Sequence, residues 1–482
     1  MKKIFISFLA LVAIVGVANA QRTWAYDLNS TQEGDAYTFE FKATTAATTA
    51  NLVLVDVDGN EVAKLPLENV VAGANSVTLE LAKLHKDAVN WAVELTGEAI
   101  AELTEVTDVN RGIYNFYLPQ DVAVDNNPES DYFGQIYVAE ATDGASDGAS
   151  DRTKTQKRGV FVYNQALEEL NPESNVGILP ANAAVLMTDG TRQALHRMSI
   201  NPVNNHVAFC YNVEGASAVW SMDPANLGGD AVNLIEGLAI TKANALCFDE
   251  EGTLYVMDNA NTSDGGKIVK VVNGELVTIA QNGIWGVQDL SLVSDGRGGL
   301  WIAQNRWAVD DYAVLSHVNA AGVIDYSVVA GSADAGMFPN DANASYRGQC
   351  AYNAAEDVLA FGGNKVVTLF KVTYDAETGV PALEKLHTTP ALGSNIDGVA
   401  FDYAGDLYAL SASSERFYKF AVPTTNNTFT TPAKSSLVIS GGTATSVDNV
   451  AISVDAQKII RNGQVLIIRD GKTFNMLGQE VK

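Results

Sequence analysis

One short pattern occurs six times in the central part of the chain. Each copy is an alternating apolar strand with a small residue two places before an anchor position, which is usually Asp or Asn. The anchors are Asp125, Asn201, Asp249, Val293, Asn353 and Asp402, and the small residues are Ala123, Ser199, Cys247, Ser291, Ala351 and Ala400. A polar turn and a second apolar strand follow each anchor. Strand, Asp/Asn/Gly turn and strand together indicate one β-hairpin in each copy.

The spacing of the copies predicts the architecture. Successive anchors lie about 45 to 75 residues apart, which suits a four-stranded sheet with its loops. In a ring of such sheets the first strands crowd around the axis, where only small side chains fit. We therefore predict an all-β protein in which residues 110–432 form a six-bladed β-propeller. Ring closure is open: the strand at 112–118 or the one at 436–440 is expected to complete a blade begun at the other end.

Two copies carry a longer phrase. Residues 397–410 read DGVAFDYAGDLYAL and residues 244–259 read NALCFDEEGTLYVMDN. These phrases resemble the blade openings of NHL-type and gluconolactonase-like six-bladed propellers. In gluconolactonase-like proteins the Asp of this phrase binds the catalytic metal and Asn residues at equivalent strand starts assist, so the resemblance implies a metal site at Asp397 and Asn244. The chain departs from that family where an early Glu is expected, because residues 118–121 read LPQD.

A ring of polar residues is expected where the inner strands begin, at one mouth of the channel. The candidate ligand-binding residues are Gln120, Asp121, His196, Arg197, Asn244, Gln288, Asp289, Gln349 and Asp397. Amide and carboxylate oxygens are ligands that Ca²⁺ prefers, so Ca²⁺ is the cofactor that such a ring suits. The alternative interpretation is that these side chains cap strand ends and bind channel water. Four aromatic residues in connecting segments are candidates for stacking on sugar rings: Trp285, Trp307, Tyr312 and Tyr346.

The first 105 residues predict an export signal and a separate module. Residues 1–20 have a basic start, an apolar run and a small-residue cleavage site, as a secretory signal peptide does. The apolar run is too short to remain as a membrane span. Residues 21–105 contain alternating strands and a DGN turn at 58–60, and resemble the Ig-like modules of exported bacterial proteins. We predict an Ig-like β-sandwich that acts as a spacer or brace, or binds a ligand directly.

The last residues, 436–482, are predicted to form a short C-terminal β segment. Its ending, FNMLGQEVK at 474–482, resembles the sorting segments recognised by type IX secretion in Gram-negative bacteria. The resemblance implies a secreted or cell-surface protein with the export machinery as a partner. The alternative is an ordinary terminal hairpin, which leaves the periplasm as the expected location.

The net charge limits which partners the protein is expected to bind, and the number of cysteines limits its disulfides. The net charge of −26 disfavours nucleic acids and anionic membranes. Cys210, Cys247 and Cys350 are too few for a disulfide framework and fall in apolar strands, so we expect buried thiols.

Two functions fit these features. The first is an exported, non-catalytic binding protein that presents a propeller mouth to a glycan, peptide or protein ligand. The second is a metal-dependent hydrolase or lyase acting on a lactone or sugar-acid substrate in the propeller channel. The absence of the early acidic residue favours the first.

Overall fold

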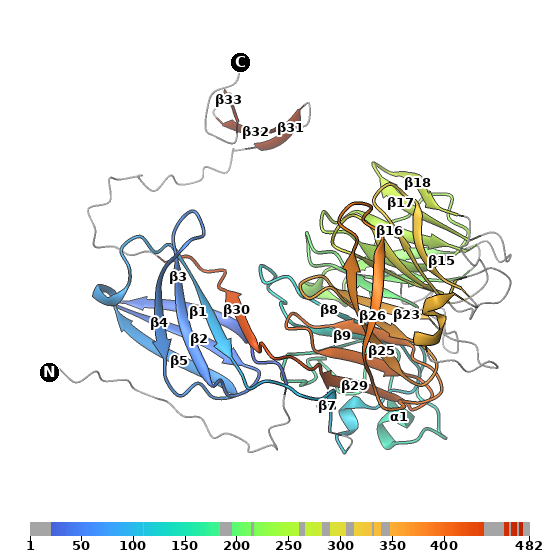
Figure 1. The fold of residues 1–482 in the computed structure, drawn as a ribbon, viewed down its shortest axis with the longest axis horizontal. Helices are drawn as coiled ribbons and strands as arrows, with labels where there is room; N and C mark the ends of the chain where they lie inside the picture. Colours follow the sequence, from blue (N-terminus) through green and yellow to red (C-terminus); the bar gives the residue numbers. More distant parts are fainter. Residues whose placement is uncertain are drawn as a thin grey trace.

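The computed structural model describes residues 21–108, 110–183, 195–213, 216–259, 266–281, 290–304, 313–329, 332–338 and 348–437, and the backbone of three further strands between 457 and 475. The predicted signal peptide, residues 1–20, lies outside these ranges. Nearly all the regular structure described is antiparallel β-sheet. Figure 1 shows two large bodies, a sandwich at the blue end of the sequence and a propeller whose strands run from light blue and teal through green and yellow to orange.

Six sheets form the blades of the propeller. The first contains β8 (Pro119–Val124), β9 (Ile136–Glu140) and β10 (Gly159–Tyr163), and the second β11 (Met198–Ile200), β12 (Val207–Tyr211), β13 (Ala218–Met222) and β14 (Val232–Asn233). The third contains β15 (Ala243–Phe248), β16 (Leu254–Asp258), β17 (Lys267–Val272) and β18 (Glu275–Ala280), and the fourth β19 (Leu290–Ser294), β20 (Leu300–Gln304), β21 (Leu315–Val318) and β22 (Ile324–Val328). The fifth contains β23 (Gln349–Asn353), β24 (Val358–Gly362), β25 (Val367–Tyr374) and β26 (Pro381–Thr388).

The sixth blade closes the ring with a strand from the other end of the propeller sequence. Its order is β27 (Gly398–Phe401), β28 (Leu407–Ser411), β29 (Arg416–Ala421) and β7 (Thr104–Glu105). The inner strands β8, β11, β15, β19, β23 and β27 contact one another in that order, and β27 returns to β8. Closure through residues 112–118 is therefore wrong, since this stretch begins with the 3-10 helix η2 (Gly112–Tyr114). Residues 438–440 of the other predicted closing strand lie outside the described ranges.

The inner strand of each blade leads into a turn in which an Asp or Asn side chain accepts a backbone N–H. The acceptors are Asp125, Asn201, Asp249, Asp295, Asn353 and Asp402, with N···O distances of 2.7 to 3.1 Å. Asx residues stabilise turns in this way. The predicted anchor of the fourth blade, Val293, is wrong by two residues, because Asp295 makes the turn and Val293 pairs with Trp301 inside the hairpin.

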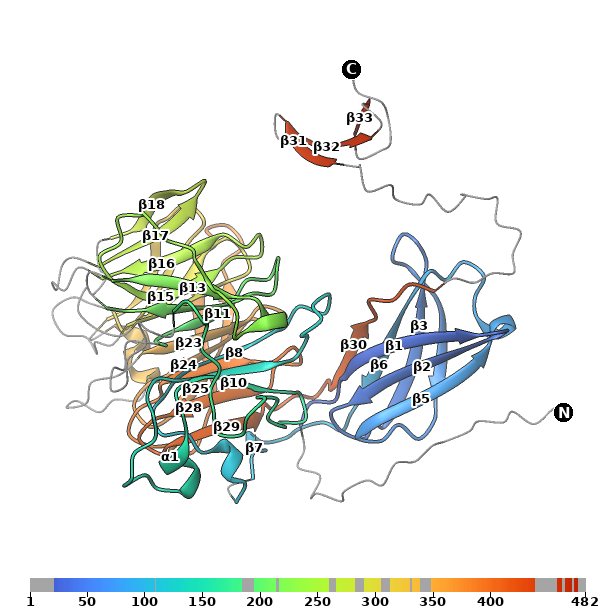
Figure 2. The same ribbon diagram turned by 180° about the vertical axis from the view of Figure 1, so that it is seen from behind.

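The sandwich has two sheets. One contains β1 (Ala25–Glu33), β2 (Ala36–Ala43) and β5 (Gly73–Glu80), and the other β30 (Thr428–Pro432), β6 (Asn90–Thr96), β3 (Thr49–Val55) and β4 (Glu61–Leu67). Phe39 and Trp91 meet edge to face between the sheets, with ring centroids 5.0 Å apart. Strand β30 follows the propeller in sequence, so the predicted boundary at residue 432 is wrong and the chain leaves the sandwich and returns to it. In Figure 2, β30 lies on the side of the sandwich that faces the propeller.

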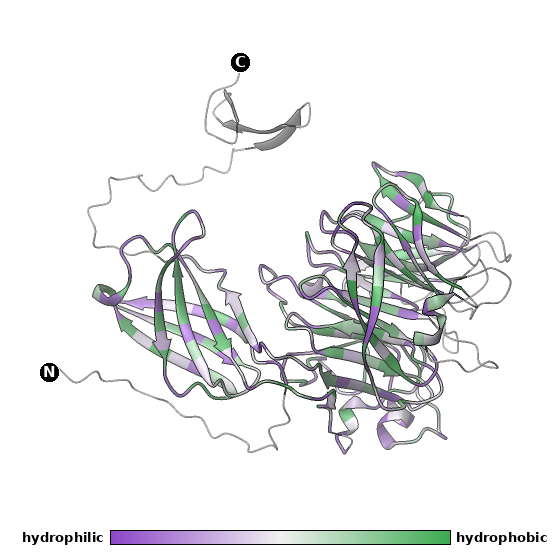
Figure 3. Ribbon diagram, viewed as in Figure 1, coloured by the Kyte–Doolittle hydropathy of each residue, from purple (hydrophilic) through white to green (hydrophobic). Residues whose placement is uncertain are grey.

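Strand burial differs between the two bodies. Strand β2 alternates buried and more exposed residues, as expected for a sheet with one face in solvent. Strands β9, β16 and β28 are buried at every position, because each blade is packed between two others. Figure 3 shows hydrophobic residues along the strands of both bodies.

The few helices are short. They are α1 (Asp151–Thr155), in the connection between β9 and β10, and the 3-10 helices η1 (Leu81–Lys83), η2, η3 (Pro224–Asn226) and η4 (Ala333–Met337). Within the described ranges, no helix has the length and hydropathy needed to cross a membrane. Near the C-terminus, β31 (Gln457–Arg461), β32 (Gln464–Arg469) and β33 (Lys472–Asn475) pair in one antiparallel sheet. The sorting role of this segment stays a prediction, and residues 476–482 lie outside the described ranges.

Arg22 joins the sandwich to the propeller. Its guanidinium is buried, and Nη1 lies 2.7 Å from Glu356 Oε1 and 2.5 Å from the carbonyl oxygen of Ala404. Nε donates to the carbonyl of Val422, and the backbone N–H donates to Asp406. Arg22 is the second residue after the predicted cleavage site, so a chain cleaved there would begin at this junction.

An aromatic cluster completes the junction. The Trp24 ring lies 5.2 Å from Phe133 and 5.7 Å from Tyr403, measured between centroids. Phe133, Glu356 and Ala404 belong to the hairpin turns that follow the inner strands of blades one, five and six. The sandwich is therefore fixed to the face of the propeller on which the inner strands end, which we call the strand-end face.

A buried histidine in the fourth blade gives a pH prediction. His317 Nδ1 lies 2.7 Å from Asp325 Oδ1, and Nε2 lies 3.0 Å from Asp295 Oδ2. Burial alone would lower the His317 pKa, but the hydrogen bonds to Asp295 and Asp325 raise it above the usual value. A raised histidine pKa contributes stability that is full below about pH 6.5 and is lost as pH rises through the folded pKa.

We therefore expect His317→Gln to reduce the free energy of unfolding more at about pH 5.5 than at about pH 9. Urea denaturation of both proteins at the two pH values measures this difference. His85→Gln, at a half-exposed histidine beside Asp87, is the matched control and should show little effect at either pH. An equal loss at both pH values for His317→Gln would contradict the role of its charge.

Candidate functional site

The propeller channel contains a cavity of about 210 Å³. Residues of all six inner strands line it, including every one of the small residues picked out in the repeat: Ala123, Ser199, Cys247, Ser291, Ala351 and Ala400. The prediction that these residues crowd around the axis is confirmed, but in the fourth blade the residue two places before the turn residue Asp295 is Val293, which also lines the cavity. The lining extends to Asn126, Ser294 and Phe401 at the strand-end face.

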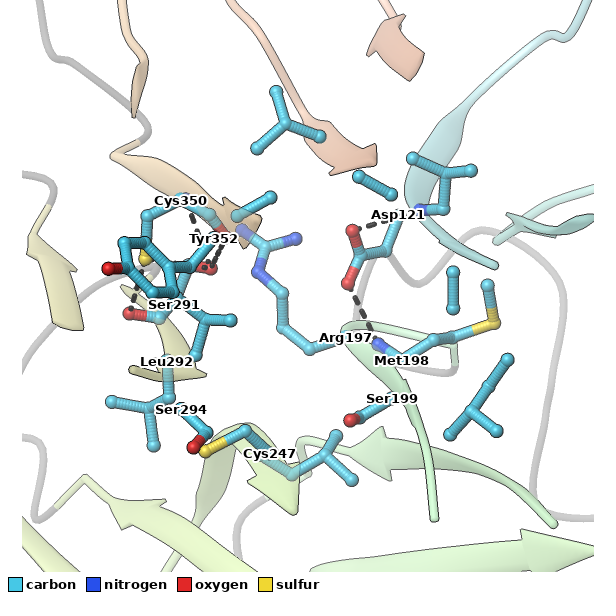
Figure 4. A pocket seen from close by; sticks show the side chains of 18 of the residues that line it. Asp121, Arg197, Met198, Ser199, Cys247, Ser291, Leu292, Ser294, Cys350 and Tyr352 are labelled. Atoms are coloured by element: carbon cyan, nitrogen blue, oxygen red, sulfur yellow. Dashed lines mark hydrogen bonds between the residues drawn. The ribbon is translucent and has the colours of Figure 1, made fainter. Parts of the chain in front are cut away.

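Arg197 closes the other end of this cavity. It directly precedes β11, is 3% exposed, and extends its guanidinium into the middle of the lining side chains (Figure 4). Its hydrogen-bond acceptors are backbone carbonyls from four blades: Nε donates to Leu290 at 3.0 Å, and Nη1 donates to Gln120 and His196 at 2.9 Å and to Asp397 at 3.3 Å. One cation thus links the starts of four inner strands.

Asp121 borders the same end of the cavity. Its Oδ1 accepts the N–H of Val122 at 2.9 Å and its Oδ2 accepts the N–H of Met198 at 2.8 Å. The carboxylate therefore bridges the first and second blades. Burial raises the pKa of Asp121 to about 6, although the positive charge of Arg197 and the two N–H donors act in the opposite direction.

The other predicted ring residues that the structure describes do not line the cavity. Gln120 donates to the carbonyls of Leu118 and Pro119, Asn244 Oδ1 accepts from Asn212 at 2.7 Å, and Asp397 Oδ2 accepts the N–H of Ala412 at 2.7 Å. His196 and Gln349 are both buried. Gln288 and Asp289 lie outside the described ranges, as do Trp285, Trp307, Tyr312 and Tyr346.

These contacts bear on the metal site that the family resemblance implies. The Asp397 and Asn244 oxygens named above already accept hydrogen bonds. Among the described residues, no three His, Cys, Asp or Glu side chains gather in a metal-binding arrangement. The metal site at Asp397 and Asn244 stays a prediction. The alternative interpretation of the ring, in which its polar groups satisfy strand ends, accounts for the contacts of Asp121 and Asp397 named above.

Some residues that line the cavity were predicted from the sequence to have only a structural role. Ser199, Ser291, Cys247 and Cys350 present hydroxyl and thiol groups along the lining, together with Tyr352 (Figure 4). The small-residue position was the signal that could have identified the first three. A residue that must be small to fit near the axis also faces whatever occupies the axis.

The three cysteines are buried, as predicted, and unpaired. Burial raises the pKa of Cys350 to about 12 and raises those of Cys210 and Cys247 above the usual thiol value. Because the thiolate is the reactive form, we expect 5,5′-dithiobis(2-nitrobenzoate) at about pH 8 to leave the native protein almost unlabelled. All 3 cysteines should react after unfolding in guanidinium. Rapid labelling of the folded protein would contradict the burial of these groups.

Comparisons with known proteins assign no family to the chain. The sequence matches no protein-family model, and no curated protein matches it. Similar solved structures include an auxiliary nutrient binding protein from Bacteroides thetaiotaomicron, with 8% identity and a TM-score of 0.42 over 83% of this chain and 97% of that one. They also include a gluconolactonase from Xanthomonas campestris, with 11% identity and a TM-score of 0.39 over 82% of this chain and 100% of that one. At these identities and TM-scores the comparisons assign no function; the six closed sheets themselves make the chain a six-bladed β-propeller.

Proposed function

We propose that the protein is exported and binds a ligand at the strand-end mouth of its propeller channel, without catalysing a reaction. The observation that carries this proposal is the channel cavity, which all six blades line and which Arg197 closes at one end. A concave site with a few polar groups aimed into it is the usual form of a binding pocket. The signal-like residues 1–20 and the sorting-like residues 474–482 support export.

The proposed ligand is a glycan, a peptide or a segment of a protein that inserts one end into the channel. The sandwich stands on the same face as the mouth and is fixed there through Arg22 and Trp24. It therefore acts as a brace beside the mouth rather than as a loose spacer. This arrangement suits a protein that holds its binding face in a constant orientation at a cell surface.

A ligand screen with a blocked variant tests the proposal. The mature chain, residues 21–482, would be screened on glycan and peptide arrays and against secreted proteins. Ser294→Trp places a bulky side chain at a partly exposed lining position, and we expect it to weaken the selected ligand at least about tenfold. Val277→Trp, on the exposed outer strand of the third blade, is the matched control and should bind normally. Equal binding by all three proteins would place the ligand elsewhere.

The second candidate is a hydrolase or lyase acting on a lactone or sugar acid in the channel. The observation in its favour is Asp121, whose carboxyl group borders the cavity and whose pKa is raised to about 6, which suits general acid–base catalysis. Turnover of a lactone or a uronate polymer, abolished in Asp121→Asn, would establish it. Turnover that survives this substitution would assign the activity to other residues.

The effect of Ca²⁺ on thermal stability distinguishes the two candidate functions. Because the proposed binding function uses no metal, we expect 1 mM Ca²⁺ to leave the melting temperature of EDTA-treated protein unchanged within about 1 °C. A ligand present at 100 times its Kd would stabilise the folded state by about 2.7 kcal/mol, which such a scan detects. Stabilisation by Ca²⁺ that disappears in Asp397→Asn would instead support the metal-dependent enzyme.

A further inference from the structure

We propose that the channel cavity binds a single carboxylate group, through the guanidinium of Arg197 and the hydroxyl of Ser199. The inference rests on the proposed binding function and names the chemical group that the channel accepts. It follows from which hydrogen-bond donors the cavity leaves without a protein acceptor.

Arg197 keeps one free nitrogen. Nε and Nη1 donate to four backbone carbonyls, whereas no acceptor among the described residues takes Nη2. The side chain is 3% exposed, but Nη2 is not among the buried atoms that lack a partner, so water in the cavity reaches it. An anion in the cavity would replace that water and form a charge-assisted hydrogen bond with Nη2.

Ser199 adds a second donor on the same side. It lies in β11, two residues after Arg197, so the alternation of side chains along the extended chain places both on the same side. Ser199 lines the cavity, and no described residue forms a hydrogen bond with its hydroxyl. Figure 4 shows its oxygen pointing into the space between Arg197 and Cys247.

The nearby carboxylate does not fill this role. Both oxygens of Asp121 accept backbone N–H groups, from Val122 and Met198. Asp121 is the one acidic residue among the lining residues, and Arg197 is the one basic residue. The free Nη2 is therefore available to a ligand.

Cavity size and net charge select the kind of anion. A volume of about 210 Å³ is below the roughly 300 Å³ of pockets that enclose drug-sized ligands. The net charge of −26 repels polyanions before they reach the channel. A monocarboxylate fits both limits, either as a small free acid or as the carboxylate end of a longer molecule.

Titration calorimetry of the mature chain tests the inference, with acetate, acetamide, triglycine and triglycine amide as probes at constant chloride. We expect acetate or triglycine to bind and the two neutral amides not to bind. Binding of acetate alone identifies a small free acid, and binding of triglycine identifies a terminal carboxylate; both results support the site. Equal binding of a carboxylate and its amide would overturn it.

Two variants test whether Arg197 and Ser199 donate hydrogen bonds to the bound carboxylate. Arg197→Gln should weaken carboxylate binding about 10- to 100-fold, the usual range for one charge-assisted hydrogen bond. Because Arg197 also holds the blades together, Ser199→Ala provides the test in a protein that folds, with an expected loss of about 3- to 10-fold. Ser327→Ala, in the outer strand of the fourth blade, is the matched control and should bind as wild type. Unchanged binding in Ser199→Ala would overturn the role of that hydroxyl.

The two proposals fail in different ways. If the screen finds a ligand that Ser294→Trp blocks but carboxylates do not bind, the carboxylate site is wrong and the binding function stands. If acetate binds through Arg197 but no larger ligand is found, the cavity is an anion site and the proposed recognition of a glycan or protein is wrong.

Discussion

Replacement of Arg197 by methionine is expected to lower the free energy of unfolding by about 3–5 kcal/mol, the range seen when one member of a buried charged network is removed. Four backbone carbonyls, from blades one, two, four and six, lose their donor at once. The buried carboxylate of Asp121 also loses the nearby positive charge. Urea denaturation followed by tryptophan fluorescence measures the loss.

Arg297→Met is the matched control for this experiment. Arg297 lies in the turn after β19, and its half-exposed side chain forms an ion pair of 2.7 Å with Asp357. An exposed pair of this kind contributes about 0–1 kcal/mol. If Arg197→Met were no more destabilising than Arg297→Met, the guanidinium would not be the element that joins the four blades. Arg197→Lys should be nearly as damaging as methionine, because an ammonium group cannot span carbonyls that a planar guanidinium reaches.

Lys419→Met should have the second large effect, again about 3–5 kcal/mol. The Lys419 ammonium lies 3.2 Å from Asp402 and 3.5 Å from Asp406, and all three side chains are buried beneath the junction with the sandwich. Without Lys419 the nearest cation is Arg22, with Nε 4.0 Å from Asp406. Two carboxylates then remain buried with little compensation.

The loss in Lys419→Met should also depend on pH. Burial already raises the pKa of Asp406 to about 6, although Lys419 opposes this shift. A carboxyl group with a raised folded pKa favours the folded state at low pH and destabilises it as pH rises through that pKa. Removing the cation enlarges this effect, so the deficit measured by urea denaturation should be smaller at about pH 5 than at about pH 8.

Lys434→Met controls for a simple loss of positive charge at the junction. Lys434 pairs with Asp131 at 2.7 Å, but the Asp131 side chain is 83% exposed. We expect a change below about 1 kcal/mol at either pH. A loss in Lys434→Met as large as in Lys419→Met would show that net charge, rather than the buried triad, stabilises the junction.

The propeller could be predicted from the sequence because each copy of its repeat corresponds to a local structure, a β-hairpin with an Asx turn. Asp125, Asp249 and Asp402 were recognisable because an Asx turn and its hairpin fall within ten or so residues. The fourth blade was misplaced by two residues because Ser291 and Val293 imitate the pattern that Asp295 completes in the turn. Two alignments of the repeat that differ by two residues are hard to distinguish in a β-strand, because a shift of two residues keeps the same side chains on the inward face.

The long-range features could not be predicted. The closing strand β7 has only two residues, Thr104 and Glu105, and its partner β29 lies more than 300 residues away, so no local pattern marks it. Strand β30 has no signal that assigns it to the sandwich rather than to the propeller. The ring of polar residues was expected to face the channel, but only Asp121 and Arg197 of those described line the cavity.

The central claim is that a ligand occupies the channel cavity from the strand-end mouth. A crystal structure of the mature chain with a ligand selected by screening tests this claim most directly. The account predicts electron density among the inner strands of all six blades, with a carboxylate within hydrogen-bond distance of Arg197 Nη2 or Ser199 Oγ. Density on the sandwich, on the outer strands or at the mouth where the inner strands begin would contradict it.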